Sequence, residues 1–402
     1  MKAFEARYWQ MLRDKSDPVS AGFTAELVHD YVLATAEHVM SPGVRPLDTL
    51  RAFPRAWWWA AMEVILEGER VPGSWRSDRE YVRALAIVEP ERFASDPLAL
   101  IARQIRMDAL FRAHRDQVTP LLREALGDPS CAHRSEVARI LLMLSRAHED
   151  EVDRALVAGQ LPHAEWPLRW AGYTIEGGRL RRLVSDVALE IAYEPGYLAE
   201  ADSKAGPSWD PSARAHVLGG RVEARHPSGA RVRMHHAITL DPVPEGLGVS
   251  LPRLVLALDL GWCADEGVER YFAHDERGEL IANDDRIDAH SVAHEESHPA
   301  IVTTRVQLVP IAGEAPHRTW GESGEARCDR VGGLAYFVQD ASYPDCTTCG
   351  RVMPHLLSLD SRLPLDGVLD NGTRALWWGS GGVATCFWCD RCRISAWSWA
   401  CT

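Results

Sequence analysis

Long apolar segments are missing from this sequence of 402 residues. No run of eighteen apolar residues occurs in it, which argues against a membrane-spanning helix. Even the most apolar stretch, residues 56–66, contains Glu63. Residues 1–15 mix charged side chains with Tyr8 and Trp9 and lack the apolar segment of a signal peptide. We therefore expect a cytoplasmic protein without a membrane partner.

Basic charge is also scarce. The chain has 44 basic and 57 acidic residues, so its net charge is −13, and its only lysines are Lys2, Lys15 and Lys204. We attribute the shortage of lysine to a GC-rich coding sequence. Proteins that bind the nucleic-acid backbone usually carry a basic surface. The charge balance therefore argues against a nucleic-acid partner.

The overall composition is that of a folded protein with more than one domain. The chain is 46% apolar and 25% charged, and its length exceeds that of one ordinary core. Apolar residues recur at helical intervals through the first half, and Asp96-Pro97, Thr119-Pro120 and Ser135 resemble helix starts. Gly127 resembles a helix end. We predict an all-helical array of short helices over residues 1–200.

The second half changes to a strand pattern. A turn-rich segment at 194–211 is followed by alternating runs at 222–234, 254–260 and 302–309. Three short segments also recur in the same order, 218–220 as 331–333, 251–259 as 353–360, and 271–275 as 386–390. We predict an α+β protein whose β-rich domain, 208–402, is internally duplicated.

Six of the nine cysteines follow residue 340. In a reducing compartment, clustered cysteines at short spacing indicate a metal site rather than disulfides. Two pairs have the two-residue gap of a zinc-binding turn, and Gly350 supplies the positive φ that such turns favour. The 39 residues between the pairs exceed the usual spacing. We predict one structural Zn²⁺ in a C-terminal zinc ribbon, about 331–402, with the ligands Cys346, Cys349, Cys389 and Cys392.

The segment His294-Glu295-Glu296-Ser297-His298 matches the zinc-protease signature. That chemistry requires both histidines on one face of a helix, with the glutamate beside the metal-bound water. Pro299 follows directly and strand-like sequence begins at Ile301. We interpret the segment as a solvated loop. A zinc-dependent hydrolase using His294, Glu295 and His298 is the alternative.

Three further motifs have structural interpretations. Gly379-Ser380-Gly381-Gly382 lacks the lysine and spacing of a phosphate loop and resembles a hairpin turn. Trp57-Trp58-Trp59 would face three directions on a helix, which favours partial burial between helices. Tryptophans near the cysteines fit either a small core or an interface. They are Trp377, Trp378, Trp388, Trp397 and Trp399.

The C-terminal segment contains an ordered set of short motifs, namely residues 331–339, 343–346, Cys349-Gly350, Met353, 356–360, 378–379, 387–389, Cys392 and 399–401. This set resembles the YwqG-like family, bacterial relatives of the eukaryotic programmed cell death protein two group. It covers about seventy residues well, extends faintly over 209–330, and leaves the helical half outside. It implies a duplicated β-rich domain without an established enzymatic activity.

The resemblance also implies a class of partner. Some bacterial members are suspected immunity proteins against polymorphic toxins, and the eukaryotic relatives are chaperones that hold a ribosomal protein. We predict a non-enzymatic protein-binding protein, with a toxin or a basic client protein as its partner. Immunity is the preferred version and a client-specific chaperone is the alternative.

Overall fold

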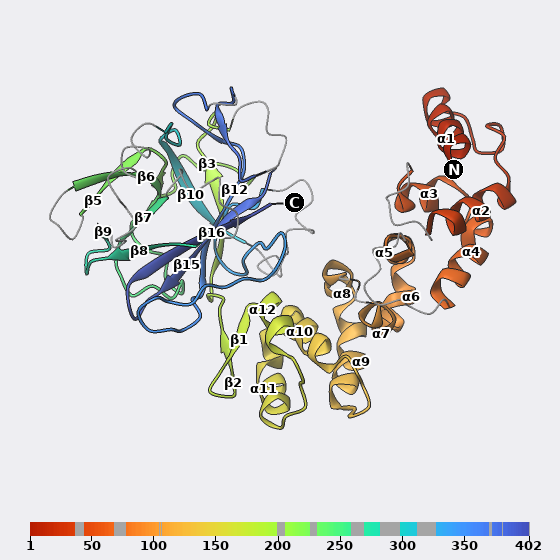
Figure 1. The fold of residues 1–402 in the computed structure, drawn as a ribbon, viewed down its shortest axis with the longest axis horizontal. Helices are drawn as coiled ribbons and strands as arrows, with labels where there is room; N and C mark the ends of the chain where they lie inside the picture. Colours follow the sequence, from red (N-terminus) through yellow and green to blue (C-terminus); the bar gives the residue numbers. More distant parts are fainter. Residues whose placement is uncertain are drawn as a thin grey trace. The chain divides into compact units, whose positions relative to one another are not determined.

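The computed structural model describes residues 1–402 except 37–43, 68–77, 104, 106, 199–205, 226–230, 259–268, 282–297, 312–326, 370–371, 380 and 402. The chain combines helices and sheet, as predicted. It forms two compact units, Met1–His148 and Glu149–Thr402 (Figure 1).

The first unit contains helices and turns over its described residues. Its elements are α1 (Lys2–Asp14), α2 (Ala25–Ala36), α3 (Pro46–Ala52), α4 (Arg55–Glu67), α5 (Asp78–Val88), α6 (Pro90–Ser95), α7 (Pro97–Ala102), α8 (Asp108–Ala113), α9 (Arg115–Gly127), α10 (Arg134–Leu144) and the 3₁₀ helix η1 (Arg146–His148).

The local helix signals are confirmed with one exception, and the start predicted at Asp96-Pro97 is the start of α7. The predicted stripe on α10 is buried, namely Val137, Ile140, Leu141 and Leu144. α9 ends at Gly127 as predicted. The prediction that Thr119-Pro120 begins this helix is wrong, because α9 starts one turn earlier and contains Pro120.

The second unit begins with two helices and continues as strands. Its elements are α11 (Glu149–Val157), α12 (Glu165–Trp170), β1 (Tyr173–Glu176), β2 (Arg179–Arg182), β3 (Ala188–Tyr193), β4 (His216–Leu218), β5 (Arg221–Arg225), β6 (Arg231–Leu240), β7 (Leu254–Leu258), β8 (Arg270–His274), β9 (Leu280–Ile281), β10 (Thr304–Pro310), β11 (Arg330–Gly332), β12 (His355–Asp360), β13 (Leu363–Pro364), β14 (Ala375–Leu376), β15 (Val383–Cys389) and β16 (Ile394–Ala400).

The boundary between the units differs from the sequence prediction, which ended the helical domain at residue 200. The second unit begins at Glu149. Helices α11 and α12 bond to the hairpin β1–β2 through Asp153 and Glu165, and β3 pairs with β10 on one side and β11 on the other. Both β3 before the turn-rich segment and β4 after it thus belong to the β-rich unit.

Twelve strands form one large sheet that nearly closes on itself (Figure 1). Their order is β4-β10-β3-β11-β12-β15-β16-β8-β9-β5-β6-β7, and β4 also pairs with β6. Among the described strands of this sheet, the pairing of β5 with β9 is parallel and the other pairings are antiparallel. Short pairs β1–β2 and β13–β14 lie outside this sheet.

Two apolar clusters cover opposite faces of β15, and the strand is buried along its whole length. Side chains alternate between the two faces of a strand. Cys386 and Trp388 pack into the larger cluster, whereas Phe387 and Cys389 pack into the smaller one. This alternation directs Cys389 toward the smaller cluster and confirms that Cys386 is a buried apolar residue.

The described helices include none that is both long enough and apolar enough to cross a membrane.

Two buried histidines make the second unit sensitive to acid. Burial lowers the pKa of His274 and of His355 to about 4, and Arg330 further lowers that of His355. His355 Nδ1 lies 3.0 Å from the carbonyl oxygen of Gly333, and its Nε2 lies 2.9 Å from Ser358 Oγ. Because the unfolded chain takes up protons near pH 6.5, stability is expected to fall as the pH drops from 6.5 toward 4. At pH 5 each histidine is expected to lower the free energy of unfolding by about 2 kcal/mol relative to neutral pH.

Urea unfolding of the full chain at pH 7.5 and pH 5 tests this prediction. His355→Gln is expected to be less stable at pH 7.5, yet to lose about 2 kcal/mol less than the parent between the two pH values. Any metal released by acid affects parent and variant alike and cancels in this difference. An equal loss in both proteins would contradict the prediction for His355.

Candidate metal centre

The first cysteine pair lies on a tight turn before β12. An isolated bridge between Asp345 and Val352 closes this turn. The Gly350 N–H donates to the Cys346 carbonyl over 2.8 Å, and the Cys346 N–H donates to the Arg351 carbonyl over 2.9 Å. Gly350 has φ 68°, as its place in the turn predicted. Both thiols of the pair are thereby presented on one side of the turn.

The second pair lies on the hairpin between β15 and β16. Cys389 is the last residue of β15, and the Cys392 N–H donates to the Cys389 carbonyl over 3.2 Å. Pairing of Cys389 with Ile394 closes the hairpin. The two pairs meet because β12 and β15 are neighbours, and the Trp388 N–H donates to the carbonyl of Pro354.

The four thiols converge as predicted. The sulfur atoms of Cys346, Cys349, Cys389 and Cys392 all lie within 4.8 Å of one another. The Sγ atoms of Cys349 and Cys389 are 3.7 Å apart. Tetrahedral zinc with bonds of about 2.3 Å places its sulfur ligands about 3.8 Å apart. The cysteines at described positions are free rather than disulfide-bonded. The arrangement has the ligand set and dimensions of a metal centre.

Two arginines, Arg181 and Arg351, interact electrostatically with Cys349 and Cys389 of this cluster. Arg181 donates to the Val352 carbonyl over 2.6 Å, and Arg351 pairs with Glu176 at 2.7 Å. Arg181 also pairs with Glu176, at 2.5 Å. The hairpin β1–β2 thus brings one carboxylate and one guanidinium beside the cysteine turn. Sequence reasoning missed both residues, since nothing local links residues 176 and 181 to a turn near 350.

The pKa values of the cysteines diverge within the cluster. A hydrogen bond from the Arg351 backbone lowers the pKa of Cys349 to about 7, and the neighbouring thiols assist. Burial raises the pKa of Cys389. A bound divalent cation would favour the thiolate at both positions, because it is the largest positive charge available there.

The protease-like segment lies mostly outside the described residues, including His294 and Glu295. His298 is described and belongs to a bend, not a helix. Its carbonyl oxygen accepts from Arg221 over 2.5 Å and lies 3.2 Å from His235 Nε2. The hydrolase alternative stays a prediction.

The tryptophans near the cysteines are mainly core residues. Trp378, Trp388, Trp397 and Trp399 belong to the larger apolar cluster. In the first unit, Trp58 is buried and its indole N–H donates to the Phe53 carbonyl over 3.1 Å, which confirms partial burial of the triple tryptophan. Gly379 and Gly381 both have positive φ, consistent with the predicted turn.

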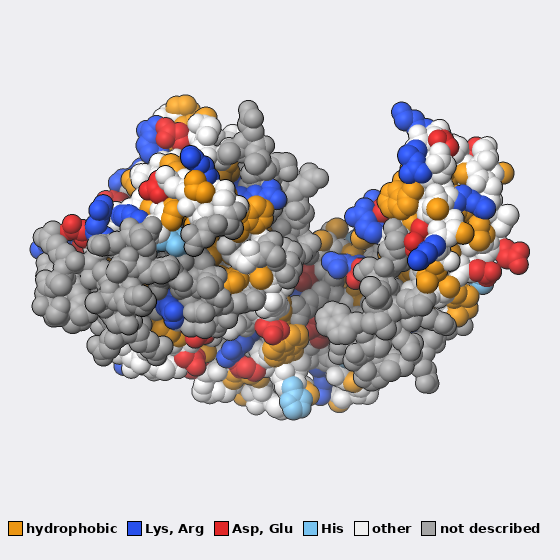
Figure 2. Space-filling model, turned by 45° about the horizontal axis from the view of Figure 1, so that its top comes forward, with side chains coloured by type: hydrophobic (Ala, Val, Ile, Leu, Met, Phe, Trp, Pro, Cys, Tyr) orange, Lys and Arg blue, Asp and Glu red, His pale blue; other side chains and the backbone are white. Residues whose placement is uncertain are grey.

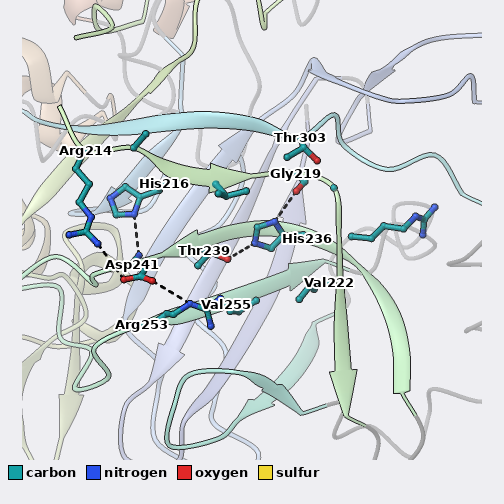
Figure 3. Close-up of a pocket in the computed structure, with 14 residues that line it drawn as sticks. Arg214, His216, Gly219, Val222, His236, Thr239, Asp241, Arg253, Val255 and Thr303 are labelled. Carbon is teal, nitrogen blue, oxygen red and sulfur yellow. Dashed lines mark hydrogen bonds and ion pairs between the residues drawn. The ribbon is translucent and has the colours of Figure 1, made fainter. Parts of the chain in front are cut away.

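A cavity of about 540 Å³ lies elsewhere in the sheet, beside β4, β6 and β7. Figure 3 shows Arg214, His216, Asp241 and Arg253 gathered at one end of it, with His236 and Thr239 at the other. Val222 and Val255 contribute apolar surface. Sequence reasoning did not predict this cavity, because strands distant along the chain build it.

Comparisons with protein-family models, with curated proteins and with solved structures find no match for this chain.

Proposed function

We propose that Cys346, Cys349, Cys389 and Cys392 bind one structural Zn²⁺ and that residues of about 331–402 form a zinc ribbon around it. The converging sulfur atoms carry this proposal. Four thiolates complete the coordination of zinc and leave no position for water or substrate. The metal would tie the turn before β12 to the hairpin β15–β16, and its role would be structural.

We also propose that the large sheet is a duplicated, YwqG-like domain. Three strands have counterparts in both order and pairing, β4 with β11, β6 with β12, and β7 with β15. Strands β8 and β16 follow them in the same order, although β16 pairs with β15 and β8 pairs with β9. In the first set, Leu218 pairs with Ile238, and in the second Val331 pairs with Leu357. Strands β8 and β16 pair with each other, as do β3 and β10, so the two halves adjoin at both places.

A histidine and a register shift recur at matching positions. The pairing of β6 with β7 shifts between His236 and Ile238, and that of β12 with β15 shifts between His355 and Leu357. His236 lies 2.8 Å from the Gly219 carbonyl oxygen and 2.8 Å from Thr239 Oγ1. His355 has the same kinds of partner, Gly333 and Ser358. In each half, therefore, a histidine on one strand contacts the backbone of a Gly-Gly pair through its imidazole ring.

This correspondence changes two of the three sequence matches. The Gly-Gly segments stay aligned, but 236–241 (HAITLD) now matches 355–360 (HLLSLD). On the sequence alone, segment 251–259 matches 353–360 through a shared proline and leucine, and segment 271–275 matches 386–390. In the proposed correspondence, β7 matches β15 and β8 matches β16, because the histidines of β6 and β12 are aligned instead.

We infer that the protein binds another protein without catalysing a reaction, with toxin immunity as the preferred role. The charge distribution supports this inference. Residues 1–148 contain 20 basic and 20 acidic residues, whereas residues 149–402 contain 24 basic and 37 acidic ones. The whole acidic excess thus belongs to the β-rich unit. On the face in Figure 2, described charges of both signs are interspersed. Long-range attraction by an acidic unit speeds capture of a basic partner.

Affinity purification of the tagged full chain from its native cells tests this function. We expect a basic protein to co-purify at low salt, with recovery falling severalfold as ionic strength exceeds about 0.15 M. For immunity, the partner is expected to be a toxin encoded directly upstream, and co-expression is expected to restore growth. A ribosomal protein as partner would favour the chaperone alternative. Recovery of no protein under any condition would contradict both.

A further inference from the structure

The cavity beside β4 contains more basic than acidic groups, although it belongs to the acidic unit. Three arginines line it, Arg214, Arg221 and Arg253, together with one carboxylate, Asp241. Arg221 is used elsewhere, because it donates to the His298 carbonyl. Arg214 and Arg253 remain at the end that holds Asp241 (Figure 3).

Asp241 is a loose acidic partner of both arginines, so the positive charge left for a ligand comes mainly from Arg214. The Asp241 carboxylate oxygens lie 3.5 Å from an Arg214 nitrogen and 3.6 Å from Arg253 Nε. Both distances exceed those of a normal charge-assisted hydrogen bond, about 2.7–2.9 Å. Arg253 has a second acidic partner, Glu279. Arg214 extends toward solvent, with 65% of its side chain exposed.

The matching place in the other half of the sheet is closed by its own side chains. There Arg327 pairs with Asp329, and both are buried. The Asp360 N–H donates to Asp329 Oδ1 over 2.7 Å. The equivalent bond beside the cavity runs from the Asp241 N–H to His216 Nδ1 over 3.2 Å. His216 therefore stands where the other half has the carboxylate of Asp329.

A second difference between the halves leaves room for the cavity, namely a valine in the first half where the second half has an arginine. Val217 corresponds to Arg330, because Val217 pairs with Thr239 as Arg330 pairs with Ser358. Arg330 is fully buried, donates to the Leu334 carbonyl over 3.0 Å and lies 4.1 Å from the centre of the Tyr336 ring. The first half thus lacks both an acidic group and a bulky side chain that the second half provides.

His216 brings no negative charge to the cavity. Burial lowers the pKa of His216, with a further contribution from Arg214, so the imidazole is neutral near pH 7. The Asp241 N–H lies 3.2 Å from its Nδ1, and the backbone of Thr239 is a further hydrogen-bond partner of the ring. The place that the carboxylate of Asp329 fills in the other half is therefore without an anion here.

We propose that this cavity binds a carboxylate, which Arg214 and Arg253 hold in the place that Asp329 occupies in the other half. The body of the ligand extends along Val217, Val222 and Val255. A volume of about 540 Å³ lies within the usual range for small ligands, about 300–1,000 Å³. A phosphate dianion is disfavoured, because Asp241 and Glu279 already place two carboxylates beside the two arginines. The carboxylate belongs either to a free small acid or to the C-terminus of a peptide.

Titration calorimetry on the full chain tests the proposal with four probes at matched ionic strength. They are butanoate, inorganic phosphate, the peptide acetyl-Gly-Ala-Leu with a free carboxylate, and the same peptide as its amide. Butanoate or the free peptide is expected to bind, with phosphate and the amide at least 10-fold weaker. Butanoate alone would indicate a free acid as ligand, and the free peptide alone a C-terminus.

Three variants separate binding from folding. Arg214→Gln is expected to weaken carboxylate binding at least 10-fold. His216→Asp is expected to abolish it, because the variant supplies the missing carboxylate internally, as Asp329 does. Arg305→Gln is the matched control, since this exposed arginine on neighbouring β10 pairs with Glu194 and does not line the cavity. Unchanged binding in Arg214→Gln, preferred binding of phosphate, or no binding of either carboxylate at 10 mM would overturn the proposal. None of these outcomes bears on the zinc site or on a protein partner.

Discussion

One zinc ion per chain is expected in the purified protein, and either Cys346→Ser or Cys389→Ser is expected to remove it. Loss of one ligand from a four-thiolate site should weaken binding by well over about 100-fold, since even outer partners of metal ligands contribute about 10–100-fold. Binding free energy at a structural site contributes to folding. If about 5 kcal/mol of it is lost, the melting temperature of the β-rich unit should fall by about 10–20 °C. Elemental analysis and thermal unfolding followed by circular dichroism measure the two effects.

Cys131→Ser is the matched control, because this half-buried cysteine belongs to the helical unit and to no cysteine cluster. It should keep the zinc and the melting temperature of the β-rich unit. Full zinc content in Cys346→Ser would contradict the assignment. A second zinc that disappears with His294→Ala would instead support the hydrolase alternative.

Features encoded over a few neighbouring residues were predictable from the sequence. The gap between Cys346 and Cys349 and the glycine that follows them define a turn, and the structure contains it with Gly350 at φ 68°. Helix α10 is likewise a local feature, and its predicted stripe is buried, as are its other residues from Val137 to Leu144. In both cases the backbone geometry of one turn or one helix determines which side chains share a face.

Features that depend on pairing between distant strands were not predictable in the same way. The turn residues at 194–211 suggested a domain linker, and only the pairing of β3 with β10 and β11 places residues 188–193 in the sheet. Arg181 and Glu176 lie beside the cysteines because β1–β2 folds over residues about 170 positions away. Register fixes such contacts, and a single sequence leaves register open.

The proposed duplication illustrates the same limit. Short matches in one sequence can be aligned in several ways, and the proline and leucine matches between 251–259 and 353–360 compete with the histidine match between 236–241 and 355–360. The register shifts beside His236 and His355 favour the second alignment in our proposal, because a bulge is a geometric feature with no fixed sequence pattern. Under that proposed alignment, His216 and Val217 of the cavity correspond to Asp329 and Arg330.

Alanine at either Gly-Gly pair is expected to destabilise the β-rich unit strongly. Gly219 has φ +78°, and a Cβ there would lie 2.4 Å from the Val302 carbonyl oxygen. Gly332 has φ +72°, and its Cβ would lie 2.3 Å from the Val187 carbonyl oxygen. Each substitution combines left-handed strain of about 1–2 kcal/mol with a backbone clash of similar or larger cost. We expect Gly219→Ala and Gly332→Ala each to lower the free energy of unfolding by about 3 kcal/mol or more, measured by urea unfolding.

Gly178→Ala separates strain from crowding. This glycine lies in the β1–β2 turn with φ +77°, and a Cβ there meets nothing within 4 Å. The Gly178→Ala variant should therefore lose only about 1 kcal/mol of unfolding free energy, which is the cost of the backbone strain alone. If Gly219→Ala and Gly332→Ala cost no more than this control, close backbone approach is not what requires glycine. If only one of them is costly, the two Gly-Gly pairs do not play equivalent roles, and the proposed duplication loses its support from this feature. Similar large losses at both are expected, because each pair lets a strand pass close under a neighbouring backbone segment while its imidazole partner anchors the turn.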